Sequence, residues 1–195
     1  MTTYQNATEA FEDLYRFINL QGVDYSGTKA VFNESFSLQY PEQMVITEPE
    51  RKFNQEYAKY EWQWYLSGNR DASEISERAK IWKNMMVPGT TEVNSNYGHF
   101  WQLNGQLARA VQELKDNPSS RRSIVVHYDV HELDRYKADT PCNVVLNFYI
   151  KDGLLNLTVF ARSIDLVYGF CNDQYTFAKL MEMTAGELGC GIGGM

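Results

Sequence analysis

Cysteine and histidine are scarce in this sequence, and their scarcity excludes several kinds of site. The 195 residues include 3 cysteines and 3 histidines. Cys142, Cys171 and Cys190 form an odd set without a C-x-x-C motif, so neither a disulfide framework nor a zinc cage is expected. The histidines lack a metal-ligand spacing such as H-E-x-x-H, and we assign them no metal. This cysteine usage is typical of a protein of the reducing cytoplasm.

Long apolar runs and an excess of basic residues are also lacking. No stretch reaches the roughly 18 apolar residues that a membrane span needs, and residues 1–17 lack the basic and apolar regions of a secretory signal. Lys and Arg number 18 against 25 Asp and Glu, a net charge of −7, which argues against general binding to nucleic acid. The 44% hydrophobic content is ordinary for a globular protein, and the length predicts a single domain over residues 1–195.

Several segments are predicted to form helices, two of them with a clear apolar stripe. Thr8 is the expected N-cap of the first and Gly22 its stop signal, Pro49 belongs to the first turn of the second, and Asn117-Pro118 ends the fourth. A further helix is expected to end near Trp82. The segments are residues 8–20, 49–66, 69–82, 99–116 and 174–188, with the stripes in 8–20 and 99–116.

Strands are expected over residues 32–40 and 120–130 and, most clearly, over 142–163. In the last of these, two β-rich runs flank Lys151-Asp152-Gly153, a hairpin turn signal. Residues 24–29 and 87–97 have the composition of a turn and a loop. Without an internal repeat or a linker, the pattern predicts one α/β (α+β) domain built on a mixed or antiparallel sheet.

Cys142 is the first candidate for chemistry. It follows Pro141 at the start of a predicted strand, where a side chain can reach a cleft. Most free cysteines are small buried hydrophobes, and this reading of Cys142 stays open.

Basic residues stand at two predicted strand ends. Arg121 and Arg122 follow Ser120, and Arg162 precedes Ser163. Arginine forks match phosphate oxygens in a bidentate way. In an acidic chain these residues are either solvated surface charges or an anion site brought together from separate segments.

Three carboxylates are candidates for proton transfer or ligand binding. Glu61 lies in a predicted helix among aromatic residues, where desolvation raises the pKa of a carboxyl toward a proton-transfer role. It fits the polar face of an amphipathic helix equally well. Asp165 and Asp173 flank the segment LVYGFCN, and each alone fits a loop or cap residue.

Read together, these pieces resemble the thymidylate synthase superfamily. The resemblance covers about residues 24–188, and its short motifs occur in the order of the family. The motifs are Glu61-x-x-Trp64, Ile81-Trp82, Tyr97-Gly98, Ser120-Arg121-Arg122, Pro141-Cys142-Asn143, and Arg162-Ser163-Ile164-Asp165 through Gly169. The resemblance implies a thymidylate synthase-like fold, with a twisted sheet flanked by helices and packed against its copy in a homodimer.

Two positions depart from thymidylate synthase itself. The family enzyme has histidine after the nucleophile, where this sequence has Asn143, and asparagine where it has Asp173. Together with the strings NSNYG, NPSSRR and GFCND, these residues resemble the deoxycytidylate (dCMP) hydroxymethylases of bacteriophages, which would place the protein in the cytoplasm of a host cell. Cytosine presents an amino donor and the N3 acceptor, which a protonated carboxyl can answer, and an ionised carboxylate can pair with N3-protonated cytosine. Uracil would leave buried polar groups unpaired in either case.

The resemblance implies conversion of dCMP to 5-hydroxymethyl-dCMP, with 5,10-methylenetetrahydrofolate as co-substrate. The Cys142 thiolate would add to C6 of the base, favoured by the charge of Arg162, and Glu61 would manage protons through water. Asp165 would hold the pterin. The remaining implied contacts are Ile81 and Trp82 for folate, Arg162, Ser163, Tyr97 and Asp173 for the nucleotide, and Arg121 and Arg122 for the phosphate of the partner subunit.

Two features of the family are missing from this sequence. Its early phosphate-binding arginine corresponds to Tyr25, for which Lys29 is the candidate substitute. The sequence ends at Met195, whereas the family continues with a strand that reads the sugar and a tail that closes over folate. The alternatives are therefore a thymidylate synthase or deoxyuridylate (dUMP) hydroxymethylase, and a catalytically weak nucleotide-binding relative.

Overall fold

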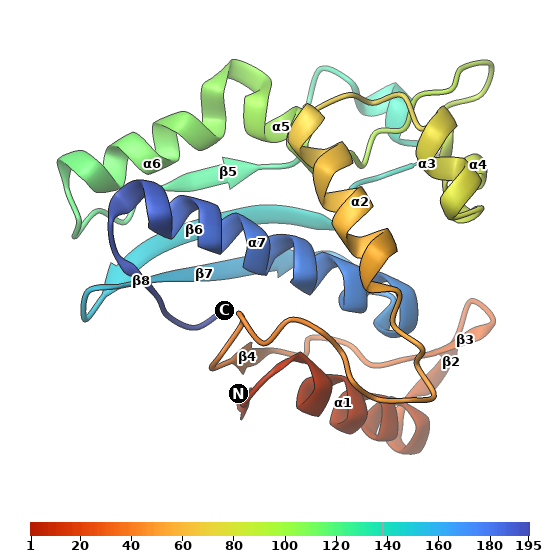
Figure 1. Ribbon diagram of the computed structural model, residues 1–195. Helices are drawn as coiled ribbons and strands as arrows, with labels where there is room; N and C mark the ends of the chain where they lie inside the picture. The colour runs from red at the N-terminus through yellow and green to blue at the C-terminus, as the bar shows by residue number, and fades with distance from the viewer. Residues whose placement is uncertain (138) are drawn as a thin grey trace.

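The computed structural model describes residues 1–137 and 139–195 and shows a central sheet with its long helices on one side (Figure 1). The sheet has the strand order β5-β6-β7-β8. Strands β5 (Ile124–Val126), β6 (Asn143–Lys151) and β7 (Leu154–Ala161) run antiparallel, and β8 (Gly191–Ile192) pairs parallel to β7. The sequence predicts a mixed or antiparallel sheet, and the sheet is mixed. None of the described helices is both long and apolar enough to cross a membrane.

The β6–β7 hairpin has the turn that its sequence predicts. Lys151 pairs with Leu154, so the loop consists of Asp152 and Gly153 alone. Both loop residues have positive φ, 53° and 76°, which is the geometry of a type I′ turn and explains the Asp-Gly pair.

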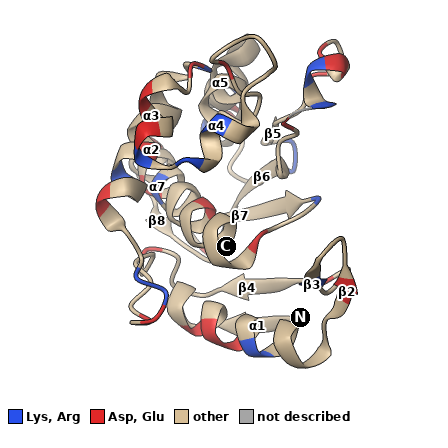
Figure 2. Cartoon of the chain, turned by 90° about the vertical axis from the view of Figure 1, so that its right-hand side faces the viewer, with Lys and Arg blue, Asp and Glu red and all other residues tan. Residues whose placement is uncertain are grey.

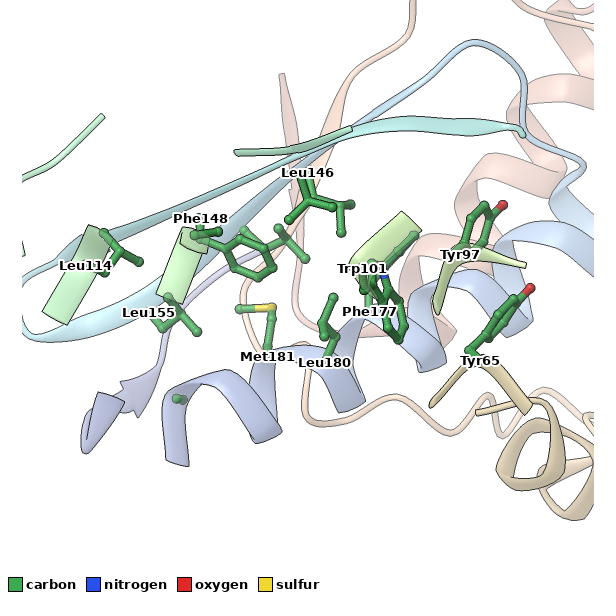
Figure 3. Close-up of a cluster of buried hydrophobic side chains, with 14 of the residues drawn as sticks. Tyr65, Tyr97, Trp101, Leu114, Leu146, Phe148, Leu155, Phe177, Leu180 and Met181 are labelled. Carbon is green, nitrogen blue, oxygen red and sulfur yellow. The ribbon is translucent and has the colours of Figure 1, made fainter. Parts of the chain in front are cut away.

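The main core lies between this sheet and the helices α2 (Gln55–Ser67), α6 (Gln106–Asp116) and α7 (Cys171–Leu188). Strand residues that alternate inward meet the apolar face of α7, as Figure 3 shows. The side chains of this contact that are almost fully buried are Leu114, Leu146, Phe148, Leu155, Leu157, Phe177, Leu180 and Met181. Their burial fixes the start of α7 against one end of the hairpin.

A second cluster joins the two ends of the described chain. Helix α1 (Ala7–Gln21) packs beside strands β1 (Thr2–Tyr4) and β4 (Phe36–Leu38), which pair in parallel. The backbones of Leu38 and Met195 exchange two hydrogen bonds, at 2.7 and 3.0 Å. Acidic side chains gather on the outer helices α1 and α3 (Ser73–Arg78), in keeping with the negative net charge (Figure 2).

The helix expected over residues 99–116 is interrupted. Helix α5 (Tyr97–Gln102) ends at a 3-10 turn, η1 (Leu103–Gly105), before α6 begins. Asn104 and Gly105 have φ of 53° and 65°. The break falls at these two residues because asparagine and glycine adopt the left-handed conformation at the lowest cost. The end of α6 at Asn117 agrees with the prediction.

Other boundaries also differ from the predictions. Asn6, not Thr8, caps α1 by accepting bonds from two backbone N–H groups, whereas Gly22 ends it as predicted. Helix α2 is capped by Asn54, so Pro49 lies outside it. Residues 69–82 contain α3 and the start of α4 (Ile81–Met85) instead of one helix.

The predicted strands are shorter than expected, and the last helix is longer. Only residues 36–38 and 124–126 of the segments 32–40 and 120–130 are strand. Residues 24–29 form most of a small hairpin, β2 (Val23–Tyr25) and β3 (Thr28–Ala30). The last helix starts at Cys171, after a π-helical turn, η3 (Leu166–Phe170), and another short turn, η2 (Leu133–Lys137), precedes β6.

Candidate active site

The candidate site lies at the end of the β6–β7 hairpin that is opposite its turn. Asn143 pairs with Ala161, so the residues just outside the hairpin, Cys142 and Arg162, are neighbours, and the Arg162 N–H donates to the Cys142 carbonyl oxygen at 2.9 Å. A register shift between Asn143 and Val145 marks a β-bulge beside them. Bulges re-aim side chains next to active sites. The turn and the bulge together place the thiol and the guanidinium at one sheet edge.

The Arg162 guanidinium lies next to the Cys142 thiol. Its Nη2 lies 3.8 Å from Sγ, and its guanidinium also donates to the carbonyl oxygens of Pro141 (3.1 Å) and Thr140 (2.7 Å). Burial raises the pKa of the Cys142 thiol, while the Arg162 charge lowers it. Because a thiolate is the reactive form, Arg162 is placed to favour it.

Asn143 joins two further groups at the same edge. This side chain is 1% exposed, and its Nδ2 donates to the Tyr97 hydroxyl at 2.8 Å and to Asp173 Oδ2 at 2.9 Å. Burial raises the pKa of Asp173 to about 7, against the opposing effect of its hydrogen bonds. A raised pKa favours the protonated carboxyl, which can both donate and accept a hydrogen bond.

Glu61 reaches the site from α2. It is 4% exposed, and its Oε1 accepts a hydrogen bond from the Tyr57 hydroxyl at 2.5 Å. Tyr57 in turn accepts from Trp82 Nε1 at 2.8 Å. Burial raises the pKa of Glu61 to about 8; Tyr57 lowers it, and the negative charge of Asp173 raises it further. Two carboxyl groups with raised pKa values therefore face one cluster, as in sites that move protons.

Tyr97 and Gly98 are placed by close backbone packing. The ring of Tyr97 stacks on that of Tyr65, with centroids 5.1 Å apart. A Cβ at position 98 would overlap the Tyr65 carbonyl oxygen. Glycine therefore lets α5 approach α2 and brings the Tyr97 hydroxyl to Asn143.

Asp165 lies near the thiol and acts as a helix cap. Its Oδ1 accepts bonds from the backbone N–H groups of Tyr168 (2.6 Å) and Gly169 (3.3 Å) at the start of η3. Its charge also raises the pKa values of Cys142 and Asp173. Capping is one of the two readings that the sequence left open for this residue.

The structure does not bring every candidate to this cluster. Arg121 and Arg122 precede β5, and Ile124 pairs with Asn147, so both arginines lie toward the turn end of the hairpin. Arg122 bonds to Glu113 there, with Nη2–Oε1 at 2.9 Å. Lys29 donates to the Asn19 carbonyl oxygen at 3.3 Å.

The two candidate folate residues differ in exposure. Ile81 is 52% exposed, whereas Trp82 is buried and enters the site only through Tyr57. Ser163 is exposed and makes no side-chain hydrogen bond to any described residue. The assignment of Ile81 and Trp82 to folate stays a prediction. The described residues hold no group of three or more His, Cys, Asp or Glu side chains that could bind a metal.

Two residues of the site were not predicted from the sequence. Tyr57 lies four residues before Glu61, the helical spacing at which side chains meet, and this spacing could have identified it. His127 is fully buried behind the site and bonds to the Asn143 carbonyl oxygen at 2.9 Å. A polar residue next to the apolar run Ile124–Val126 was the available signal.

Two comparisons with known proteins find related sequences. The family model described as thymidylate synthase matches residues 10–195. A protein from Corynebacterium aurimucosum named thymidylate synthase is 32% identical over 139 residues, which are 67% of this chain and 51% of that protein. The chain thus spans about half the length of this curated relative. Because the family model matches residues 10–195, a region that includes the hairpin, α2 and α7, the chain belongs to the thymidylate synthase family.

Proposed function

We propose that the protein is a one-carbon transferase that converts dCMP to 5-hydroxymethyl-dCMP. The observation that carries the proposal is the hydrogen-bonded pair Asn143–Asp173 beside Cys142. The nucleophile Cys142 and the carboxyl of Asp173, which would read the base, therefore lie in one described cluster. Residues 1–195 act in this proposal as one thymidylate synthase-like domain.

The preference for cytosine follows from the hydrogen bonds that Asp173 can make. Its Oδ2 accepts the Asn143 amide and can also accept from the cytosine amino group, while a proton on Oδ1 donates to N3. Uracil presents an acceptor at O4 and a donor at N3. In this arrangement O4 would face the acceptor Oδ2, and the N3–H would face the proton on Oδ1. A site built for one hydrogen-bond pattern rejects the other because buried groups are left unpaired. The pKa of Asp173, about 7, supports a proton being available.

The reaction uses the residues of the cluster in distinct steps. The Cys142 thiolate adds to C6, which breaks the C5–C6 double bond and makes C5 nucleophilic, and it leaves again when that double bond re-forms; Arg162 favours the thiolate. Bound 5,10-methylenetetrahydrofolate would supply the one-carbon unit, and Asp165, Ile81 and Trp82 would hold it. Glu61 exchanges protons near C5 through water, for which a pKa of about 8 suits it. Overall, dCMP, methylenetetrahydrofolate and water give 5-hydroxymethyl-dCMP and tetrahydrofolate.

The phosphate contacts require a second copy of the chain in this proposal. Arg162, Ser163 and Lys29 would serve the nucleotide bound by the same chain, and Arg121 and Arg122 that of the partner. The outward face of the sheet exposes apolar side chains, among them Ile124, Val126 and Phe160, the last 62% exposed. Such patches mark interaction sites. A homodimer formed through this face would cover them.

A thymidylate synthase acting on dUMP is the second candidate. It is favoured by the name of the Corynebacterium relative, and the thiol, Arg162 and Glu61 would serve it equally well. Asp173 is the residue that separates the two candidates. A third outcome, nucleotide binding without turnover, would make the chain a catalytically weak relative.

The test is tritium release from C5-labelled nucleotides in the presence of methylenetetrahydrofolate. We expect release from dCMP with a hydroxymethyl product and no dihydrofolate. Asp173→Asn should shift the ratio of kcat/KM for dCMP over dUMP toward dUMP by about 100-fold or more, because an amide can offer its N–H donor to O4 of uracil and its carbonyl oxygen to the N3–H.

The matched control is Asp152→Asn at the hairpin turn, where asparagine adopts the same left-handed conformation. It should leave the ratio unchanged. Release from dUMP alone by the unmodified protein would overturn the dCMP assignment. Release from neither nucleotide would favour the weak binding relative, and an unchanged ratio in Asp173→Asn would refute the base-contact argument.

A further inference from the structure

His127 lies directly behind the base-reading pair and has no exposed surface. It follows β5, and its backbone N–H donates to the Val144 carbonyl oxygen at 2.8 Å, inside the bulge between Asn143 and Val145. Both ring nitrogens are also engaged. Nδ1 contacts the Asn143 carbonyl oxygen at 2.9 Å, and Trp101 Nε1 donates to Nε2 at 3.0 Å.

These contacts determine which ring nitrogen carries the proton. A carbonyl oxygen only accepts and an indole N–H only donates, so the proton is on Nδ1 and the lone pair on Nε2. Burial lowers the pKa of His127 to about 4, so the ring is neutral at physiological pH. The imidazole therefore donates a hydrogen bond to Asn143 in one fixed tautomer.

The ring also supports Asn143 through a second route. It stacks on Tyr97 with centroids 4.9 Å apart and planes 19° apart, and on Phe177 at 6.4 Å and 16°. Figure 3 shows Tyr97 beside Trp101 and Phe177 at one end of the core. The Tyr97 hydroxyl accepts the Asn143 side-chain amide. His127 thus contacts the backbone of Asn143 and the ring that receives its side chain.

We infer that His127 is a positioning residue for base selection: it fixes the bulge at Asn143, and thereby aims the Asn143 amide at Asp173. The ring type follows from this role. Phenylalanine could stack but would leave the Asn143 carbonyl and the Trp101 N–H unpaired in the core, and buried unpaired groups are costly. A flat side chain with a donor on one edge and an acceptor on the other meets all the contacts. The inference deepens the proposed function in its nucleotide readout and stands independently of it in its structural readout.

Two amide substitutions of His127 separate positioning from general stability. In His127→Asn the side-chain Nδ2 lies at the same distance along the chain as Nδ1 and can still donate to the Asn143 carbonyl. In His127→Gln the amide lies one carbon farther out, toward Trp101, and this donor is lost. A purely structural role predicts similar behaviour for the two. His99→Gln is the control, because His99 is near Arg70 and not Asn143.

The first readout needs no nucleotide: hydrogen exchange of the Asn143 side-chain amide, followed by NMR. We expect exchange at least tenfold faster in His127→Gln than in the unmodified protein, and within about threefold of it in His127→Asn and His99→Gln. Unchanged exchange in His127→Gln, or equal acceleration in the Asn and Gln variants, would overturn the inference whichever nucleotide the protein prefers.

The second readout is the ratio of kcat/KM for dCMP and dUMP, or of the two Kd values if turnover is too slow. We expect His127→Gln to reduce the preference between the nucleotides at least tenfold and His127→Asn to retain most of it. The preference of the unmodified protein tests the proposed function, and its change in the variants tests the inference. A loss of preference without faster amide exchange would also count against positioning through Asn143.

Discussion

Polar residues from motifs of the thymidylate synthase family lie at both ends of the β6–β7 hairpin, buried at one end and exposed at the other. At the end of Cys142, Asn143 and Glu61 are almost fully buried and bonded to partners from α2, α5 and α7. At the turn end, the side chain of Arg122 is 76% exposed and that of its partner Glu113 is 31% exposed. The first end is organised by one chain. At the second, Arg122 has one carboxylate partner from its own chain and otherwise faces solvent.

This difference separates two ways of building a site. Buried polar groups with fixed partners are pre-organised, and they retain raised pKa values that serve proton transfer. Exposed arginines on a sheet corner acquire a defined geometry when an anion or a neighbouring subunit approaches. We call the turn end of the hairpin, with Arg121 and Arg122, the corner. The contrast predicts that substitutions at the buried end reduce the activity of their own chain strongly, and that substitutions at the corner reduce the activity of the partner chain.

The largest expected effect is at the thiol. Cys142→Ala should lower tritium release by about 10⁴-fold or more, because no other group in the cluster can attack C6. Cys190→Ser, a partly buried thiol at the C-terminal end of α7, is the matched control and should change the rate less than about twofold. Comparable losses in both variants would mean that the effect is on folding, and retained activity in Cys142→Ala would remove the thiol from the mechanism.

The next effect tests whether the corner acts between chains. Arg121→Ala should weaken nucleotide binding by about 10- to 100-fold, the cost of a lost charged hydrogen bond of about 1.5–3 kcal/mol. If Arg121 serves the partner's site, an equal mixture of Arg121→Ala and Cys142→Ala chains that exchange subunits should regain about one quarter of the unmodified activity. Half of the dimers are then mixed, and each has one intact site.

The control for this experiment mixes Cys142→Ala with Glu61→Gln. Both residues belong to the cluster formed within one chain, so every site in a mixed dimer lacks one of them, and no activity should return. Recovery in this mixture, or none in the mixture with Arg121→Ala, would contradict the division of the hairpin into an end that acts alone and a corner that acts on a partner.

The sequence was sufficient where local rules decide the structure. Asp152-Gly153 identified the hairpin because a two-residue turn with positive φ needs those residue types. Once the hairpin is known, strand pairing makes Cys142 and Arg162 neighbours. The prediction of one helix over residues 99–116 was wrong because the apolar stripe continues on both sides of Asn104 and Gly105, although these two residue types are themselves a local signal for a break.

The polar partners of the site could not be predicted in the same way. The bond from Asn143 to Asp173 joins residues 30 positions apart, and it depends on how α7 packs on the sheet. His127 belongs to no metal motif, so the sequence assigns it no role. The two hydrogen bonds of its ring nevertheless connect Trp101 in α5 to Asn143 at the bulge. The sequence identified residue types with useful chemistry; their partners were set by packing between elements distant in the chain.

The smallest expected effect is on the free energy of unfolding. Its dependence on pH should differ between a buried carboxyl, Glu61, and an exposed one, Glu56. The pKa of Glu61 is about 8 in the folded protein, against an ordinary value near 4.5. The unfolded chain therefore releases this proton at lower pH than the folded protein does, so the contribution of Glu61 to stability is fully present below about pH 4.5 and is lost as the pH rises toward 8. The loss is about 1.4 kcal/mol per pH unit within this window, before relaxation of the structure reduces it.

Glu61→Gln keeps the shape of the neutral acid without a proton to lose. In urea unfolding it should match the unmodified protein near pH 5 and exceed its free energy of unfolding by about 2 kcal/mol or more near pH 8.5. Glu56→Gln, an exposed residue of the same helix paired with Lys59, should shift the free energy by less than about 1 kcal/mol at either pH. A stability gain from Glu61→Gln that is equal at both pH values would show that Glu61 is charged in the folded protein, and the buried end would then differ from the surface in packing alone.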